Sequence, residues 1–168
     1  NAKYFVSPPK FLQEERKRYI DPSTKRLYYS ISKYSSSYHV KELLCKKPVV
    51  LERYWLDHAT FLIAKNYEFS STLPPPESTI YNWPTDLLKP DVVFFINGSR
   101  TMSHVGFEFN NFTERLSEVV RLMKDIKLVE INPNRNSATV IQEIINYIED
   151  RTNSDFKTYF NNNQTNNN

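Results

Sequence analysis

The stretch Pro48-Val49-Val50-Leu51-Glu52-Arg53-Tyr54-Trp55 decides the expected fold class of this chain. A short aliphatic run that ends in an acid, a guanidinium and two aromatics is typical of a buried parallel strand. In open α/β sheets, ligands collect outside the carboxyl ends of such strands. A carboxylate at that point can hold a hydrated magnesium ion, and an adjacent arginine can donate two parallel hydrogen bonds to a phosphate. The stretch therefore predicts phosphate chemistry at Glu52 and Arg53, against the plainer interpretation of a solvated ion pair.

Strands and helices alternate along the rest of the chain. Apolar runs predict strands at residues 4–6, 49–51, 90–97 and 128–131. Apolar residues at helical spacing predict helices over residues 11–20, 25–46, 59–66, 110–125 and 136–148. Such alternation produces right-handed crossover units and a parallel sheet with helices on both faces. We therefore expect an α/β fold with a three-layer parallel sheet.

Two of these helices carry apolar residues that are expected to face the core. The helix over residues 25–46 follows Asp21-Pro22-Ser23-Thr24, which offers a capping hydroxyl. Its apolar positions are Leu27, Tyr28, Ile31, Tyr34, Tyr38, Val40, Leu43 and Leu44. The last helix has a stripe that is expected to cover the sheet, formed by Val140, Ile141, Ile144, Ile145 and Ile148.

Length and composition predict one domain over residues 1–151 and a disordered, asparagine-rich tail over residues 152–168. A formal charge of only +3, with 24% charged residues, argues against an extended nucleic-acid surface. No apolar run approaches the roughly 20 residues needed to cross a bilayer, so no membrane partner is expected. The single cysteine, Cys45, excludes a disulfide framework and a cysteine-based zinc site.

Two other features bear on phosphate chemistry. Residues 68–83 contain Pro74-Pro75-Pro76 and predict a long surface loop of the kind that often covers sites. The only glycines are Gly98 and Gly106, so the sequence has no glycine-rich loop in which successive backbone N–H groups converge on nucleotide phosphates.

At this point the residues carry a resemblance. Two stretches resemble the thymidylate kinase family, most closely its mitochondrial UMP-CMP kinase branch. The first is Val50-Leu51-Glu52-Arg53-Tyr54-Trp55, followed by Ala59-Thr60-Phe61, and the second is Trp83-Pro84-Thr85-Asp86-Leu87-Leu88-Lys89-Pro90-Asp91. The similarity runs from about Tyr4 to Ile148. It implies a P-loop nucleotide kinase fold whose first strand, phosphate loop and first helix are not in this sequence, so an N-terminally incomplete domain is expected.

The resemblance assigns roles to residues of the acceptor site. Glu52 stands where the family has an aspartate near magnesium and the transferred phosphate, and Arg53 matches the arginine that grips the acceptor phosphate. Arg16 resembles a helix arginine that meets the same phosphate, while Tyr29 and Lys33 match an aromatic and a basic residue that contact the base. From the residues alone, Arg16 also fits a solvated basic face and Tyr29 a core aromatic.

The remaining roles concern the lid and the donor. Residues 103–108 align with the mobile lid and Arg115 with the helix after it, so the lid residues implied are Arg100, Glu108 and Arg115. Asn134 and Arg135 occupy the position that borders the adenine of ATP. The implied cofactors are Mg²⁺ and ATP, and the implied partner is a pyrimidine nucleoside monophosphate. The resemblance also points to a homodimer formed through helices, and it leaves both the mitochondrion and the cytoplasm open as compartments.

The sequence departs from the family at several positions. Glu52 replaces the usual aspartate, Gly106 stands in the place of a lid arginine, and Asp57 stands where a serine is common. These departures keep a second class of function open, a degenerate kinase-like domain that binds a nucleotide or a protein without chemistry. A third class, nucleic-acid binding by the basic run from Lys10 to Arg26, is disfavoured because acidic residues are nearly as numerous as basic ones.

Overall fold

The structure, a computed structural model, describes residues 2–97 and 107–165. Side chains are described for residues 2–97 and 112–152. The described residues fall into two compact units, one made of residues 2–91 and 107–127 and the other of residues 92–97 and 128–165. Together they contain five α-helices and two pairs of parallel strands, which confirms the α/β class. A single three-layer sheet and a single domain over residues 1–151 stay predictions.

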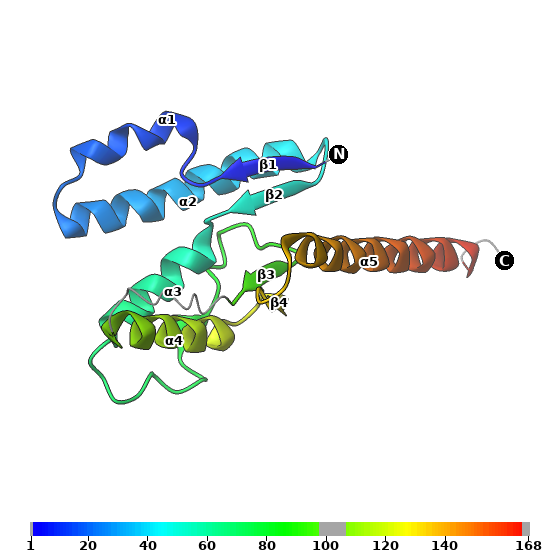
Figure 1. Cartoon of the computed structure of the whole chain (residues 1–168). Helices are drawn as coiled ribbons and strands as arrows, with labels where there is room; N and C mark the ends of the chain where they lie inside the picture. Colours follow the sequence, from blue (N-terminus) through cyan, green and yellow to red (C-terminus); the bar gives the residue numbers. More distant parts are fainter. Residues whose placement is uncertain (1, 98–106, 166–168) are drawn as a thin grey trace. The chain divides into compact units, whose positions relative to one another are not determined.

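The first unit holds most of the secondary structure (Figure 1). In chain order its elements are β1 (Lys3–Val6), α1 (Lys10–Gln13), the 3₁₀ helix η1 (Glu15–Arg18), α2 (Pro22–Leu44), β2 (Val49–Glu52), α3 (Trp55–Asn66), the 3₁₀ helix η2 (Thr79–Tyr81) and α4 (Phe107–Leu122). Strands β1 and β2 pair in parallel, with Lys3 opposite Val49 and Val6 opposite Glu52. Both strands therefore end at the same edge, and α2, which connects them, packs against β2.

The start of α2 differs from the sequence prediction. The carboxylate of Asp21 accepts from the backbone N–H groups of Ser23 at 2.9 Å and Thr24 at 3.0 Å, and Pro22 takes the first helical position. The cap is therefore a carboxylate and not a hydroxyl. An aspartate before a proline satisfies this helix end because proline has no N–H to leave unpaired.

The buried face of α2 was predicted correctly only in part. Tyr28 and Val40 are buried as predicted, whereas Leu27, Ile31 and Tyr38 are exposed. The other buried positions are polar or charged: Ser32, Lys33, Ser36 and Ser37. Apolar spacing therefore predicted the helix but not most of the residues that face inward. Serines are small enough for the helix to approach the strand ends closely, so the inward face is largely polar.

The apolar core of this unit lies between α3 and α4. Ala59, Ile63 and Ala64 pack with Val119 and Met123. The predicted surface loop over residues 68–83 contributes to this core. Tyr81 is fully buried and donates from its hydroxyl to the Pro74 carbonyl at 2.9 Å, and the Trp83 indole N–H donates to the Leu87 carbonyl at 3.1 Å. A polyproline stretch predicted exposure, but two aromatics with satisfied polar atoms outweigh it.

Two helix boundaries also differ from the prediction. The helix expected over residues 11–20 is divided into α1 and η1, and neither piece has a buried residue. Without an apolar face to bury, a longer helix gains little from tertiary packing. The helix expected over residues 110–125 begins three residues earlier and also ends three residues earlier, as α4 (Phe107–Leu122).

The second unit contains β3 (Val93–Ile96), β4 (Leu128–Ile131) and α5 (Ser137–Thr165). The strands are parallel, with Val93 opposite Leu128, and the Asn136 side chain caps α5 as predicted. The prediction that the α5 stripe covers the sheet is wrong for Ile141, Ile145 and Ile148, which are exposed.

Helix α5 meets the strands instead through Tyr147, whose ring lies 5.4 Å from that of Phe94. Helical backbone extends to Thr165, while disorder of residues 152–168 in solution stays a prediction. Over the described part of the chain, every helix is too short or too polar to span a bilayer.

The Asp21 cap makes a stability prediction. Replacing Asp21 with alanine leaves two backbone donors of α2 without their acceptor, so the free energy of unfolding is expected to fall by about 1 kcal/mol in urea titration. Asp21→Asn, which keeps a capping oxygen, is the matched control and is expected to lose only a small part of this. Equal losses in the two variants would contradict the capping role.

Candidate functional site

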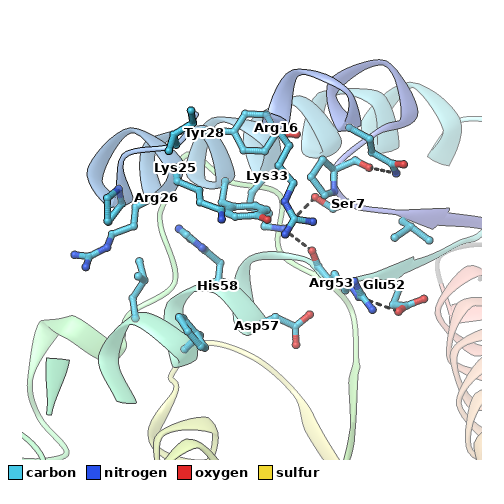
Figure 2. A pocket seen from close by; sticks show the side chains of 18 residues that line it. Ser7, Arg16, Lys25, Arg26, Tyr28, Lys33, Glu52, Arg53, Asp57 and His58 are labelled. Atoms are coloured by element: carbon cyan, nitrogen blue, oxygen red, sulfur yellow. Dashed lines mark hydrogen bonds and ion pairs between the residues drawn. The ribbon is translucent and has the colours of Figure 1, made fainter. Parts of the chain in front are cut away.

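A pocket opens at the edge where β1 and β2 end (Figure 2). Its volume is about 1170 Å³, and its walls come from the end of β1, from η1, α2, the end of β2 and the first turns of α3. Small-molecule sites in proteins have volumes of about 300–1,000 Å³, so a nucleotide-sized ligand has room here. The position agrees with the general rule that ligands of α/β proteins bind outside the carboxyl ends of parallel strands.

Arg53 has an unusual backbone conformation at this edge. Its φ of 58° places a residue with a Cβ in the left-handed region, immediately after the last residue of β2. The conformation turns the chain from β2 into α3, which starts two residues later at Trp55. A left-handed residue other than glycine costs about 1–2 kcal/mol, and such strain gathers at functional sites.

The Arg53 side chain is held on one side only. Its Nε lies 3.3 Å from Oε1 of Glu52, and Oε2 of Glu52 accepts from the Tyr4 hydroxyl. The Arg53 side chain is 72% exposed, so this pair contributes only about 0–1 kcal/mol to stability. Within the described residues the two Nη groups of Arg53 donate no hydrogen bond. They face solvent and can donate to a ligand in parallel.

Lys33 comes from α2 and points at the same corner. Only 4% of its surface is exposed, and its Nζ donates to the Arg53 carbonyl at 2.7 Å and to Ser7 Oγ at 3.3 Å. Burial lowers the Lys33 pKa to about 8; the Arg53 charge adds to this effect and the Asp57 charge opposes it. Figure 2 shows Lys33 directed at the backbone of Arg53, with the Arg53 guanidinium beside Glu52.

Tyr29 forms an aromatic surface next to these cations. The Arg16 guanidinium lies 5.7 Å and the Lys33 Nζ 5.9 Å from the centre of the Tyr29 ring. The neighbouring Tyr28 hydroxyl donates to the Leu12 carbonyl at 2.6 Å, which ties α2 to α1. Cation–π attraction in this geometry holds Arg16 at the pocket although its own helix buries nothing.

Helix α3 supplies the opposite wall through Asp57 and His58. Burial of the Asp57 carboxyl group raises its pKa. The charges of Lys33 and Arg53 oppose this shift, and the charge of Glu52 adds to it. Because Asp57 is also exposed to solvent in the pocket, the net effect on its pKa is limited. Burial, followed by the Lys33 charge, lowers the His58 pKa to about 4. His58 Nε2 lies 2.9 Å from Ser30 Oγ, so a neutral imidazole faces the pocket at pH 7.

The structure thus brings together five of the residues singled out from the sequence. Its pocket is lined by Arg16, Tyr29, Lys33, Glu52 and Arg53, although the roles assigned to them stay predictions. Lys33 is engaged with protein atoms, not directed at a base-sized space, which differs from the implied contact.

The lid residues are not gathered at this pocket in the described part of the chain. Arg115 lies on α4, 3.2 Å from Glu118 and 3.1 Å from the Ser70 carbonyl, and it does not line the pocket. Arg100 lies outside the described residues, and so does the Glu108 side chain.

Asn134 and Arg135 belong to the second unit. The Asn134 N–H donates to the Asn132 side chain, and Arg135 pairs with Glu143 of α5. Their proposed contact with adenine stays a prediction.

Sequence patterns missed Ser7, Ser36 and His58 as members of the site. Ser7 is buried and contacts Lys33, Ser36 is buried and contacts Ser7, and His58 is a lone histidine, which carries little signal in a sequence. Nothing local distinguishes these residues, since their contacts join positions 26 to 29 residues apart in the chain.

The residues fit a water-mediated magnesium contact and not a closed metal site. Among the described residues, no three or more His, Cys, Asp or Glu side chains converge as a ligand set. Both carboxylate oxygens of Glu52 already interact, one with Arg53 and one with Tyr4. Mg²⁺ keeps several waters and is usually held by one or two carboxylates plus substrate phosphates, so Glu52 fits as the acceptor of a magnesium-bound water.

Comparison with known proteins assigns no family to this chain. No family model matches the chain, and no curated protein matches it significantly. The resemblance to the thymidylate kinase family therefore rests on the residues quoted above.

The strained backbone of Arg53 predicts that two variants differ in stability but not in phosphate binding. Arg53→Gly is expected to be about 1 kcal/mol more stable than Arg53→Ala in urea titration, because glycine adopts a positive φ without steric cost. Both variants lack the guanidinium and are expected to bind phosphate ligands equally poorly. Equal stability of the two variants would show that the residue is not strained in solution.

His58 predicts a change of stability with pH. Its pKa is about 4 in the folded chain and about 6.5 when exposed, so the unfolded chain binds more protons between these values. The free energy of unfolding is therefore expected to fall as the pH drops from 6.5 towards 4. In His58→Gln this decline is expected to be shallower, and an NMR titration in which His58 has a pKa near 6.5 would contradict the burial.

Proposed function

We propose that this chain carries the acceptor site of a nucleoside monophosphate kinase of the thymidylate kinase type, acting on a pyrimidine nucleotide such as dTMP, UMP or CMP. The observation that carries the proposal is the pocket at the strand ends, which Arg16 of η1, Lys33 of α2 and Arg53 of the turn after β2 all line. Arg16 and Lys33 lie over the Tyr29 ring, and Lys33 also contacts the Arg53 carbonyl. The three-layer sheet of a P-loop nucleotide kinase is part of the same proposal.

The charge of the pocket lining supports a phosphate ligand. Cationic side chains lining the pocket are Arg16, Lys25, Arg26, Lys33 and Arg53, and the acidic ones are Glu52 and Asp57. Glu52 is paired with Arg53 through Nε alone, so the Arg53 Nη groups remain for a second acceptor. An arginine fork binds a phosphate through parallel charge-assisted hydrogen bonds, the strongest type of hydrogen bond available to a surface site.

The other walls of the pocket support a planar, partly apolar group. Phe61 and Leu62 follow His58 by about one helical turn on α3, and the three side chains line the pocket together with Tyr29. His58 is neutral at pH 7, so this wall combines aromatic faces with an uncharged hydrogen-bonding ring. A nucleobase matches that surface because it stacks on aromatic faces and forms hydrogen bonds at its edge.

In the proposed reaction an oxygen of the bound monophosphate forms a bond to the terminal phosphorus of ATP, and the bond from that phosphorus to the bridging oxygen breaks, which releases ADP. Arg53 and Arg16 orient the acceptor phosphate and offset its charge during this transfer. Magnesium, when bound with the nucleotides, neutralises phosphate charge. The proposal assigns the donor phosphates to a glycine-rich loop that this sequence does not contain.

A second function, binding without phosphoryl transfer, has specific observations in its favour. Gly106 occupies the lid position at which the family has an arginine, and Arg115 is occupied by Glu118 and the Ser70 carbonyl. Asp57 adds a negative charge to the pocket of an anionic substrate. A degenerate kinase-like domain that retains nucleotide binding is therefore the alternative.

Direct binding tests the acceptor site. Calorimetry of the full chain with dTMP, UMP and CMP is expected to detect at least one of them, and Arg53→Ala to weaken its affinity about tenfold or more, because a charge-assisted hydrogen bond contributes about 1.5–3 kcal/mol. Tyr29→Ala is expected to weaken it as well. Matched controls are Lys17→Ala beside Arg16 and the exposed Tyr38→Ala on α2, and both are expected to leave affinity unchanged. Absence of binding by all three nucleotides would remove the proposal.

Activity separates the two functions. The full-length gene product is assayed with ATP, Mg²⁺ and the nucleotide that binds, and ADP formation is measured. Turnover that depends on Arg53 supports the kinase, whereas binding without turnover supports the non-catalytic alternative.

A further inference from the structure

Lys33 is the most deeply buried charged group of the pocket, and it has no carboxylate partner. Within the described residues it forms no ion pair, and its Nζ donates only to the Arg53 carbonyl and Ser7 Oγ. A buried ammonium without a countercharge is costly, so this arrangement needs a compensating contact or a bound anion.

A small polar network fixes the position of this ammonium. Ser7, at the end of β1, is fully buried, and the Ser36 hydroxyl lies 2.9 Å from both Ser7 Oγ and the Ser32 carbonyl. The network therefore connects the end of β1, the inward face of α2 and the turn after β2. Its last contact, at 2.7 Å, is with the carbonyl of the one residue that has a left-handed backbone at this edge.

The groups that face Lys33 come from every element around the pocket. Arg16 approaches from η1, Arg53 from the turn after β2, and Asp57 and His58 from α3. The Tyr29 ring lies beside it on α2. Of these charges only Asp57 favours the protonated amine, and burial outweighs it, which brings the Lys33 pKa to about 8. The proton on Lys33 is thus weakly held at neutral pH.

We infer that Lys33 is a positioning residue that maintains the left-handed turn of Arg53 through its carbonyl, and that binding of a nucleotide phosphate at Arg53 is coupled to the proton on Lys33. This inference rests on the proposed function. The coupling follows from electrostatics, because a phosphate dianion beside the ammonium stabilises its charged form and raises its pKa. By linkage, the same phosphate binds more weakly once Lys33 has lost its proton.

The sign of the effect is defined. The second ionisation of a phosphate monoester occurs near pH 6, so the ligand is already a dianion above pH 7.5. The phosphate itself therefore takes up no proton when it binds between pH 8 and 9.5. Affinity is expected to be constant near pH 7 and to fall above pH 8 by up to about tenfold per pH unit.

Calorimetry in paired buffers tests this coupling on the full chain. The nucleotide monophosphate that binds best is titrated at pH 7.0 and pH 8.7 in buffers of different ionisation enthalpy, which gives the number of protons taken up. Net uptake of a fraction of one proton is expected at pH 8.7 and close to none at pH 7.0. Binding with no uptake at pH 8.7 would overturn the inference while leaving the acceptor site intact, whereas no binding at any pH would overturn the proposed function itself.

Variants assign the proton to Lys33. Lys33→Arg keeps a permanent charge and is expected to lose both the proton uptake and the fall in affinity above pH 8, and Lys33→Met is expected to lose the uptake and to bind more weakly at pH 7. Lys41→Met, on the exposed side of α2, is the matched control and is expected to keep the uptake. A purely structural Lys33 would lower affinity without changing the proton count, and uptake that persists in Lys33→Arg would refute the assignment. If Lys33→Met does not fold, Lys33→Arg alone decides whether the proton taken up on binding goes to Lys33.

Discussion

The contact between the Lys33 ammonium and the Arg53 carbonyl is the interaction on which the site depends. It joins α2 to the turn between β2 and α3 at 2.7 Å, and through Ser7 it also reaches the end of β1. Parallel pairing places the two strand ends at one edge, but pairing alone does not dictate the turn that follows. A charged donor at the carbonyl of Arg53 favours a backbone conformation that a residue with a Cβ would otherwise avoid.

This arrangement also explains why α2 has a polar inward face. Ser32 and Ser36 are buried and replace the aliphatic residues expected at a helix–strand contact. Their small volume brings the helix close enough for a lysine side chain to end at the strand edge, and their hydroxyls satisfy polar atoms that would otherwise be buried without partners. Apolar packing is concentrated elsewhere, between α3 and α4, where Ile63 and Val119 are buried.

The pocket therefore has two parts that differ in chemistry. Cations line it from Arg53 and Lys33 at the strand ends to Lys25 and Arg26 on α2, while the wall formed by α3 and Tyr29 is aromatic and uncharged at neutral pH apart from Asp57 (Figure 2). A ligand that carries an anion at one end and a planar ring at the other is complementary to this distribution. Asp57 is the feature that fits such a ligand least well, and it is one of the positions where this chain differs chemically from the family that it resembles.

The sequence by itself determined the α/β class, the positions of β2, β3 and β4, and the gathering of Glu52 and Arg53 at a strand end. These follow from local rules, since a short aliphatic run such as residues 49–51 favours a strand and its polar residues follow where the strand ends. The burial expected for this strand was wrong, because Val50 is exposed and no residue of β2 is buried. The start of α5 was predicted within one residue for the same local reason, whereas the capping group of α2 was predicted wrongly as a hydroxyl.

Only the tertiary structure decided which face of α2 is buried, how the 68–83 segment packs, and what Lys33 contacts. The spacing of apolar residues shows that a helix has an apolar face but not whether that face is turned towards the core. Leu27 and Ile31 were therefore predicted to be buried, whereas Ser32 and Lys33 are the buried residues. Tyr81 and Trp83 become buried through partners that no local pattern reveals. Burial lowers the Lys33 pKa to about 8, and desolvation depends on the whole surrounding shell of atoms. The contacts of Lys33 are with Ser7 and Arg53, which are 26 and 20 residues away in the chain.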